Sequence, residues 1–210
     1  MSQIITRLFD SFADAEHAVI ELERVGVPHG DISIVSHKSD KKHARAHVRE
    51  PHDNTAGEAA AKDAGAGAAI GGVVGAAGGV LAGLGLLAIP GLGPVVAAGW
   101  LASTAVGAVV GGAVVGAAGG IVGALTNAGV SREEAEVYAE GVRRGGTLVS
   151  AKVAEDKLAL AEDAVSNVGY VDVAARGAAY RQGGWSHFDE SASPYADDEI
   201  EIERSRWARR

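Results

Sequence analysis

Residues 64–89 read AGAGAAIGGVVGAAGGVLAGLGLLAI, and this stretch decides how the rest of the chain is organised. It opens a run without charge, because no ionisable side chain occurs between Asp63 and Arg132. Soluble domains rarely contain so long a run, since Lys, Glu, Arg and Asp are mostly surface residues. The run therefore predicts a segment that is embedded in a membrane or buried by protein. One flank of the chain precedes this segment in the sequence and the other follows it.

A tight turn is expected in the middle of the run, at residues 89–94 (IPGLGP). Proline cannot continue a helix interior, and two prolines beside two glycines indicate a turn. We expect a helical hairpin over residues 64–126 with apolar segments of about 64–89 and 95–126. At roughly 1.5 Å per residue, each segment exceeds the hydrocarbon thickness of about 30 Å. The expected turn residues are Pro90, Gly91, Gly93 and Pro94.

Glycines recur every four residues in both apolar segments, which places them along one stripe of each helix. In the first segment they are Gly67, Gly71, Gly75, Gly79 and Gly83. In the second, Gly107, Gly111, Gly119 and Gly123 keep this spacing with a break at Val115, and Gly112, Gly116 and Gly120 form a second row beside them. Small residues at this spacing allow helix backbones to approach closely in lipid. The pattern predicts a glycine zipper in which the two helices pack on each other or on other copies.

The energy of membrane insertion is modest. The nine Ile, Val and Leu residues of segment 64–89 contribute about −4 kcal/mol at a bilayer centre. Its nine glycines each cost about 0.8–1.0 kcal/mol relative to alanine in a water-exposed helix. Two alternatives to insertion stay open: hairpins of several copies that form the core of a soluble assembly, and a Gly/Ala-rich spacer without fixed structure.

The flank before the run predicts a strand, a helix and a second strand. Residues 4–9 are rich in strand-forming residues, and Ser11 with Asp14 resembles a capping box that starts a helix. Apolar residues at helical spacing continue to Gly26, which ends the helix. Residues 31–35 then read as a strand.

The flank after the run repeats this order behind an additional helix. That helix starts at Ser131 with a capping box and ends near Arg144, before Gly145 and Gly146. A strand at 147–153, an amphipathic helix ending at Gly169 and a short strand at 170–174 follow.

The two strand–helix–strand units together predict an α+β fold, a ferredoxin-like βαββαβ sandwich interrupted by the hairpin. The expected parts are residues 1–36 as the first half, 37–63 as a basic, His-containing linker, 64–126 as the hairpin, 127–175 as the second half and 176–210 as a disordered tail. Because both halves form one domain, both must lie in the same compartment.

Charge and composition narrow the classes of partner and of chemistry. The net charge of −8 disfavours nucleic-acid binding. Basic residues flank the hairpin and its turn has none, so both termini are expected in the cytoplasm. The sequence lacks cysteine, a phosphate-binding loop, a nucleophile elbow and an HExxH pair. We therefore expect a protein that is not an enzyme and binds no cofactor.

Histidines cluster in the linker, where His43 and His47 are four residues apart and His37 and His52 lie nearby. They could share a helix face as metal ligands or as a pH-sensitive patch, although solvated histidines are the commoner explanation. A metal- or pH-responsive sensor is therefore a further hypothesis.

Two stretches resemble the general stress protein family (YflT-like, heat-induced): residues 9–36, from Phe9-Asp10-Ser11 to Asp31-Ile32-Ser33-Ile34-Val35-Ser36, and residues 129–149, with Glu140-Gly141-Val142-Arg143-Arg144-Gly145-Gly146. The resemblance implies a bacterial, stress-associated protein of unassigned molecular activity and supplies no catalytic residue. The combined expectation is a homo-oligomeric protein of the bacterial cytoplasmic membrane that contacts lipid through its hairpin, with a cytoplasmic assembly as the alternative. Its protein partner is unknown.

Overall fold

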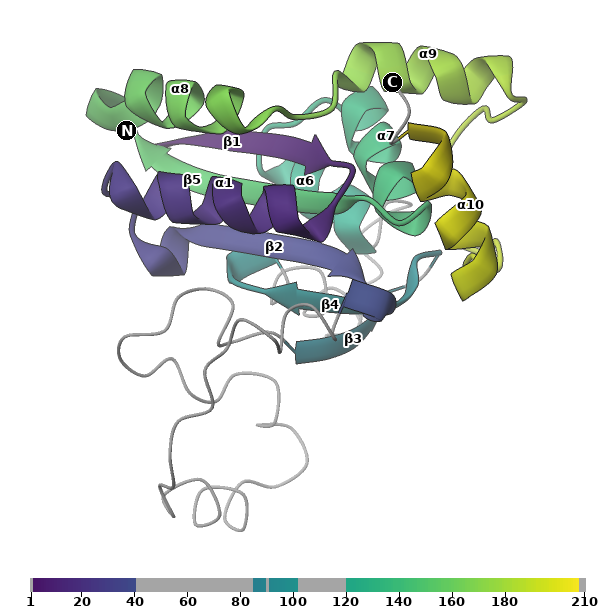
Figure 1. Ribbon diagram of the computed structural model, residues 1–210. Helices are drawn as coiled ribbons and strands as arrows, with labels where there is room; N and C mark the ends of the chain where they lie inside the picture. Colours follow the sequence, from purple (N-terminus) through teal and green to yellow (C-terminus); the bar gives the residue numbers. More distant parts are fainter. Residues whose placement is uncertain (1, 41–84, 90, 102–119, 208–210) are drawn as a thin grey trace, which may run out of the picture.

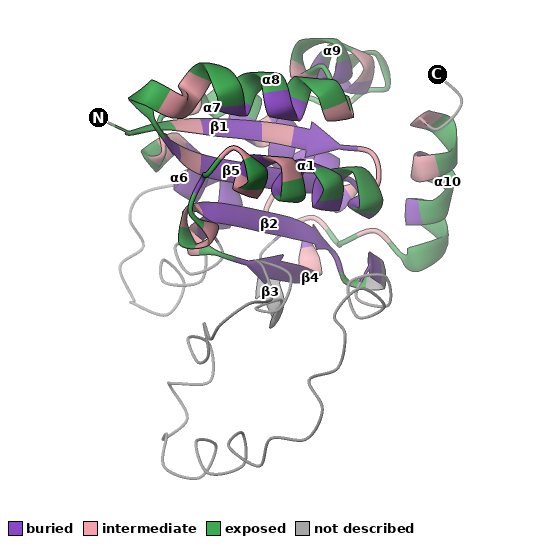
Figure 2. Ribbon diagram, turned by 60° about the vertical axis from the view of Figure 1, so that its left-hand side comes forward, coloured by how far each residue is buried: buried purple, intermediate pink, exposed green. Residues whose placement is uncertain are grey.

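A computed structural model describes residues 2–40, 85–89, 91–101 and 120–207 (Figure 1). They form a five-stranded antiparallel sheet in the order β1-β5-β2-β4-β3. Helices cover both faces of the sheet, as the burial colours of Figure 2 show. The expectation of a mixed helix-and-strand fold with both flanks in one domain is confirmed, since strands from both flanks pair directly.

The centre of the sheet consists of β1 (Ser2–Phe9), β5 (Thr147–Ala154) and β2 (Ile32–His37). β1 pairs with β5 along its whole length, from Ser2↔Ala154 to Phe9↔Thr147. β2 pairs with the other edge of β5, from Ile32↔Ala151 to Val35↔Leu148. Side chains alternate between the two faces of the strands, so each strand contributes to both hydrophobic cores.

One face of the sheet is covered by α1 (Phe12–Arg24) and α8 (Leu158–Val168), which lie side by side in Figure 1. The hydroxyl of Ser11 accepts a hydrogen bond from the Asp14 amide at 3.1 Å and caps α1. Short 3₁₀ turns precede β2 and α8: η1 (His29–Asp31) and η3 (Glu155–Lys157). The core under the two helices includes Phe9, Val19, Leu22, Ile34 and Val165.

The opposite face is covered by α6 (Gly120–Asn127) and α7 (Arg132–Arg143). Ser131 caps α7 by accepting a hydrogen bond from the Glu134 amide at 3.3 Å. The core on this face contains Leu8, Val35 and Leu148 from the sheet and Leu125 and Val142 from the helices. The second layer of helices makes this a three-layer domain rather than the two-layer sandwich expected.

Strands replace part of the expected helical hairpin. β3 (Gly85–Ile89) and β4 (Gly93–Ala98) pair with each other, and β4 pairs with β2 from Ile34↔Ala98 to His37↔Val95. The expected helices over 64–89 and 95–126 are therefore wrong for residues 85–89 and 95–98. The physical reason is tertiary: the open edge of β2 offers backbone partners to β4, in which Val95 and Val96 favour a strand and Gly93 and Pro94 disfavour a helix.

The remaining expected hairpin residues, 64–84 and 102–119, lie outside the described residues, as does the linker beyond Asp40. The first linker residues form η2 (Lys38–Asp40). Within the described part of the chain, no helix has the length and apolar character needed to cross a membrane.

The expected last strand at 170–174 is also wrong. Val171 donates one backbone hydrogen bond to the carbonyl of Leu8 at 2.8 Å, at the free edge of β1. The chain then enters α9 (Val173–Gln182), because the Asp172 carboxylate accepts hydrogen bonds from the Ala174 and Ala175 amides. An aspartate N-cap thus starts a helix where the apolar pattern indicated a strand.

The tail differs from the disordered segment expected. Besides α9 it contains α10 (Asp197–Trp207), which lies at the end of the sheet near the end of β2 (Figure 1). Tyr180, Phe188 and Ile200 are buried. Residues 173–207 form the C-terminal segment.

Candidate functional site

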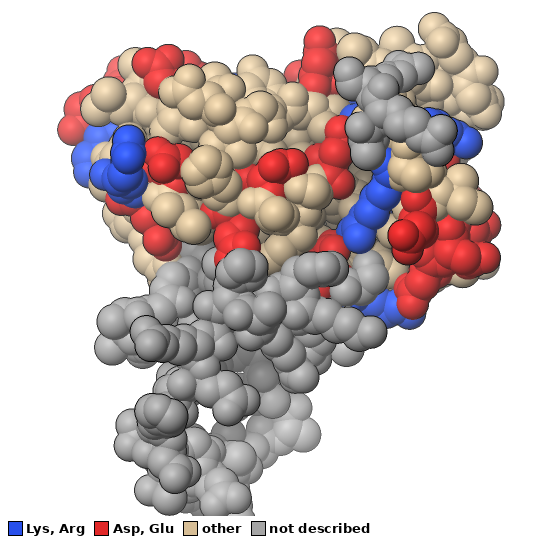
Figure 3. Space-filling view, viewed as in Figure 1, with Lys and Arg blue, Asp and Glu red and all other residues tan. Residues whose placement is uncertain are grey.

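Buried charged side chains gather where the C-terminal segment meets the end of the sheet. They are Asp40, Glu140, Arg143, Arg176 and Glu203. Figure 3 shows basic and acidic side chains interleaved over this end of the molecule. Burying charges costs several kcal/mol per ion unless they are paired, so the pairing of these groups defines what the site can do.

Glu140 of α7 is the centre of the cluster and is fully buried. Its carboxylate accepts hydrogen bonds from Arg143 at 3.0 Å and from Arg144 at 2.6 Å. Arg144 also lies 3.7 Å from the carboxylate of Glu203 on α10. The end of α7 therefore supplies the Glu140 carboxylate and the two arginine cations that pair with it. α10 adds a second carboxylate, that of Glu203.

The guanidinium of Arg144 stacks on aromatic rings of the C-terminal segment, 4.4 Å from the ring centre of Tyr180 and 5.6 Å from that of Tyr195. Burial acts to lower the pKa of Arg144, but the hydrogen bond and charge of Glu140 outweigh it and raise the pKa. For the Tyr180 phenol, burial disfavours the charged form and raises the pKa to about 12. Arg144 therefore stays cationic and Tyr180 neutral at physiological pH.

A second ion pair joins α10 to the end of β2. Arg204 donates to the Asp40 carboxylate at 2.6 Å and to the carbonyl of Gly145 at 2.8 Å. Asp40 also accepts a hydrogen bond from the hydroxyl of Ser36, which contacts Thr147 Oγ1 at 2.9 Å. The carboxylate of Asp40 thus holds together η2, the end of β2 and α10.

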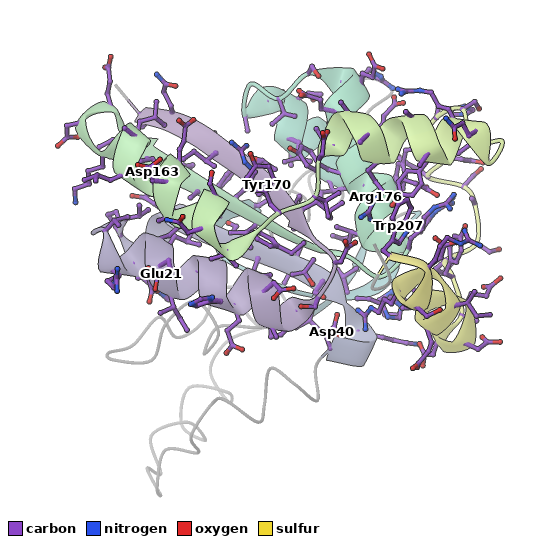
Figure 4. All side chains as sticks on the ribbon, turned by 45° about the horizontal axis from the view of Figure 1, so that its top comes forward. Glu21, Asp40, Asp163, Tyr170, Arg176 and Trp207 are labelled. Carbon is purple, nitrogen blue, oxygen red and sulfur yellow. The ribbon has the colours of Figure 1, made fainter. Side chains whose placement is uncertain are left out.

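Arg176 of α9 forms the third connection. Its guanidinium lies 3.7 Å from the ring centre of Trp207 and 2.8 Å from the Asp10 carboxylate, which follows β1. Figure 4 labels Arg176, Trp207 and Asp40 and shows how they lie along the junction of α9, α10 and the sheet. The edge of the Tyr180 ring also meets Trp207, with 6.2 Å between ring centres. Cation–π and edge-to-face contacts thus join the two helices.

The C-terminal segment also covers the turn between β3 and β4. The Leu92 amide donates to the Ile89 carbonyl at 3.1 Å, and Gly91 and Gly93 both have a φ of +75°. A Cβ on Gly91 would lie 2.8 Å from the Phe188 ring, and a Cβ on Gly93 would lie 2.6 Å from Pro194. Glycine is therefore required at both positions by backbone conformation and by the close approach of the C-terminal segment.

The predicted site residues lie in different elements of the structure. Gly91 and Gly93 lie in the β3–β4 turn and Pro94 in β4, while Pro90 lies outside the described residues. Gly120 opens α6, and a Cβ there would lie 3.4 Å from Ile89 of β3, so this glycine faces a strand instead of a second helix. Gly123 also lies in α6. The other zipper glycines, together with His43 and His47, lie outside the described residues.

Metal binding has no support in the part of the chain that the structure describes, where no group of three or more His, Asp or Glu side chains could hold an ion. His37 is buried at the end of β2. Burial lowers its pKa, while the carboxylates of Asp197 and Asp40 act in the opposite direction. The neutral imidazole is therefore the stable form at physiological pH.

The buried acids of the cluster are neutralised by arginines of the same chain, and two of these pairs join the C-terminal segment to η2 and to α7. Sequence reasoning missed the cluster because the tail was expected to be disordered. Two signals were present: aromatic residues at Trp185, Phe188, Tyr195 and Trp207, and acids before arginines along 197–206, which suits a helix dipole.

Comparison of the chain with family models, with curated proteins and with solved structures found no match. The family resemblance of residues 9–36 and 129–149 therefore stays a prediction.

Proposed function

We propose that this protein is a non-catalytic, stress-associated bacterial protein that self-associates and contacts the cytoplasmic membrane through its glycine-rich stretches. The observation that carries the proposal is the absence of any ionisable side chain between Asp63 and Arg132, combined with glycines at four-residue spacing. The paired, neutralised charges of the candidate site support a role in holding chain segments together instead of transforming a substrate.

We also propose that β1, α1, β2, β5 and α8 represent a ferredoxin-like core whose last strand has been replaced. The strand order β1-β5-β2 and the position of α1 and α8 on one face support this relation. The single hydrogen bond from Val171 to Leu8 lies where the last strand of such a sandwich would pair. The β3–β4 hairpin extends the opposite edge.

The pairing of the β3–β4 hairpin with the sheet limits how the apolar stretches can contact a membrane. β2 and β3 belong to one sheet, so residues 41–84 leave and return on the same side of a bilayer. Their charge-free part, residues 64–84, has 21 residues, and as a helix of about 30 Å it suffices for one crossing but not two. With β3 and β4 in the sheet, we propose shallow membrane contact or packing between copies.

Cell fractionation tests the proposal with the full chain. Recovery with the membrane fraction, release by carbonate and self-association in detergent are the expected results, whereas resistance to carbonate extraction would favour a spanning arrangement over shallow contact. A discrete large particle that forms without detergent or lipid would favour the soluble assembly instead. Recovery of the whole population as a detergent-free soluble monomer would contradict both membrane contact and self-association.

A further inference from the structure

We propose that the C-terminal segment is an intramolecular clasp: it keeps the β3–β4 hairpin in the sheet, and its release frees the hairpin. The structure brings together two regions distant in sequence, the turn of the apolar run and the last helix of the chain. Only the effect on membrane contact rests on the proposed function. The clasp itself is a claim about the α/β domain.

The first contact is at the turn. Leu92 is buried in the same hydrophobic cluster as Phe188 of the C-terminal segment. Gly91 lies against Phe188 and the backbone of Glu190, and Gly93 lies against Pro194. The segment therefore runs directly over the point at which β3 turns into β4.

The second contact is at η2, where the chain leaves the sheet toward the apolar run. Arg204 pairs with Asp40 at 2.6 Å, and Lys38 lies 3.6 Å from Asp197 at the start of α10. A third contact seats α10 on the turn after α7, where a Cβ on Gly145 would lie 2.5 Å from Ile200. The C-terminal segment thus contacts both the β3–β4 turn and η2, after which the chain leaves the sheet toward the apolar run.

The hairpin is attached to the rest of the sheet more weakly than the central strands are. β4 pairs with β2 over four residues, whereas β1 pairs with β5 over eight, and β3 pairs only with β4 among the described strands. Edge elements with few partners open at a lower free energy than the centre of a sheet. Contacts from the C-terminal segment therefore add to the core packing of Ile89, Val95 and Ala97 in keeping the hairpin docked.

Release of the C-terminal segment would change how the apolar run can contact a membrane. While β3 and β4 are paired, the apolar run is divided by strands that belong to the domain. Once they leave the sheet, the charge-free stretch ahead of α6, residues 64–119, is one continuous apolar stretch of 56 residues around the turn, which is long enough for two helical crossings of about 20 residues each. The clasp would then decide between a shallow and a spanning state.

Hydrogen exchange of the full-length protein in detergent-free buffer tests the clasp without any membrane. We compare the wild type with Arg204→Gln, which removes the pair with Asp40. The matched control is Arg24→Gln on α1, whose side chain is 76% exposed and pairs with Glu21 outside the C-terminal segment. A chain ending at Gly183 provides a second, independent release of the clasp.

The expected result is an increase of about tenfold or more in the exchange of β3 and β4 amides in Arg204→Gln and in the shortened chain. The amides of β5, and those of β3 and β4 in Arg24→Gln, should exchange as in the wild type. Unchanged exchange of β3 and β4 in both released variants would overturn the proposal. So would an equal increase in β5, since the segment would then stabilise the whole domain.

Flotation with vesicles of phosphatidylethanolamine and phosphatidylglycerol tests the membrane step separately. If the clasp controls membrane contact, the shortened chain and Arg204→Gln float in larger amount than the wild type and Arg24→Gln. Faster exchange of β3 and β4 without increased flotation would keep the clasp but contradict its link to the membrane.

Discussion

Arg204 and Asp40 are 164 positions apart in the sequence, yet the guanidinium of one donates to the carboxylate of the other at 2.6 Å. The Asp40 side chain is only 3% exposed and that of Arg204 29%. The pair joins the last helix to the end of β2, immediately before the chain enters its apolar run. It is the most buried connection between the C-terminal segment and η2, so its loss should be measurable.

Replacing Arg204 by alanine is expected to lower the free energy of unfolding by about 3 kcal/mol, because a buried carboxylate then loses its cation. Arg24→Ala removes a more exposed pair with Glu21 on α1 and should cost less than about 1 kcal/mol. Urea denaturation of both variants measures the difference. Equal small losses would show that Asp40 is adequately solvated without Arg204.

Alanine at Gly91 is expected to be more destabilising than alanine at Gly129. Both glycines have positive φ, +75° and +94°, and each substitution should cost roughly 1–2 kcal/mol in backbone strain. A Cβ at Gly91 also meets Phe188 and Glu190, whereas Gly129 has open space around it. In a chain ending at Gly183 the two costs should become similar, as thermal denaturation would reveal; a persistent difference would place the clash within the hairpin.

Alanine at Gly99 should be among the most damaging substitutions. Gly99 has a φ of +86°, and a Cβ there would collide with the carbonyl of Ile32 and with Ser33. These are backbone and core atoms of β2 that cannot move aside, so a loss above about 3 kcal/mol is expected. Gly184→Ala is the matched control, because its φ of +91° is similar and no atom lies within 4 Å. Comparable stability of the two variants by denaturation would refute the close approach.

His37 should make the domain sensitive to mild acid. Burial lowers the pKa of His37 in the folded protein below its ordinary value of 6.5, so the unfolded chain binds a proton first as pH falls. Stability should be complete above pH 6.5, decline as pH falls from there toward the lowered pKa, and lose nothing more from this group below it. Denaturation at a series of pH values should give a smaller decline for His37→Gln; identical profiles would rule out this histidine.

Two of the four tyrosines should titrate late. Burial raises the pKa of Tyr138 and of Tyr180 to about 12 each. Because these folded-state values lie above the ordinary 10.0, stability should be fully present below pH 10 and decline as pH rises toward 12. An alkaline absorbance titration should show two phenols ionising near pH 12, and Tyr180→Phe should remove one of them. Ionisation of all phenols near pH 10 would contradict their burial.

Features with local causes were predictable from the sequence. The helix starts at Ser11 and Ser131 are confirmed, because each cap hydroxyl bonds an amide only three residues away. The end of α1 at Gly26 follows from the positive φ that this glycine adopts. Strands β1, β2 and β5 were likewise indicated by local runs of strand-forming residues.

The tertiary structure alone decided what the middle and the end of the chain do. Residues 93–98 are apolar enough for a helix, and they became β4 because β2 had a free edge 60 residues earlier in the chain. Residues 197–207 are polar enough for a flexible tail, and they became α10 against a cluster centred on Glu140. Local patterns report hydrogen bonds between near neighbours, whereas both of these outcomes depend on partners that only folding brings within reach.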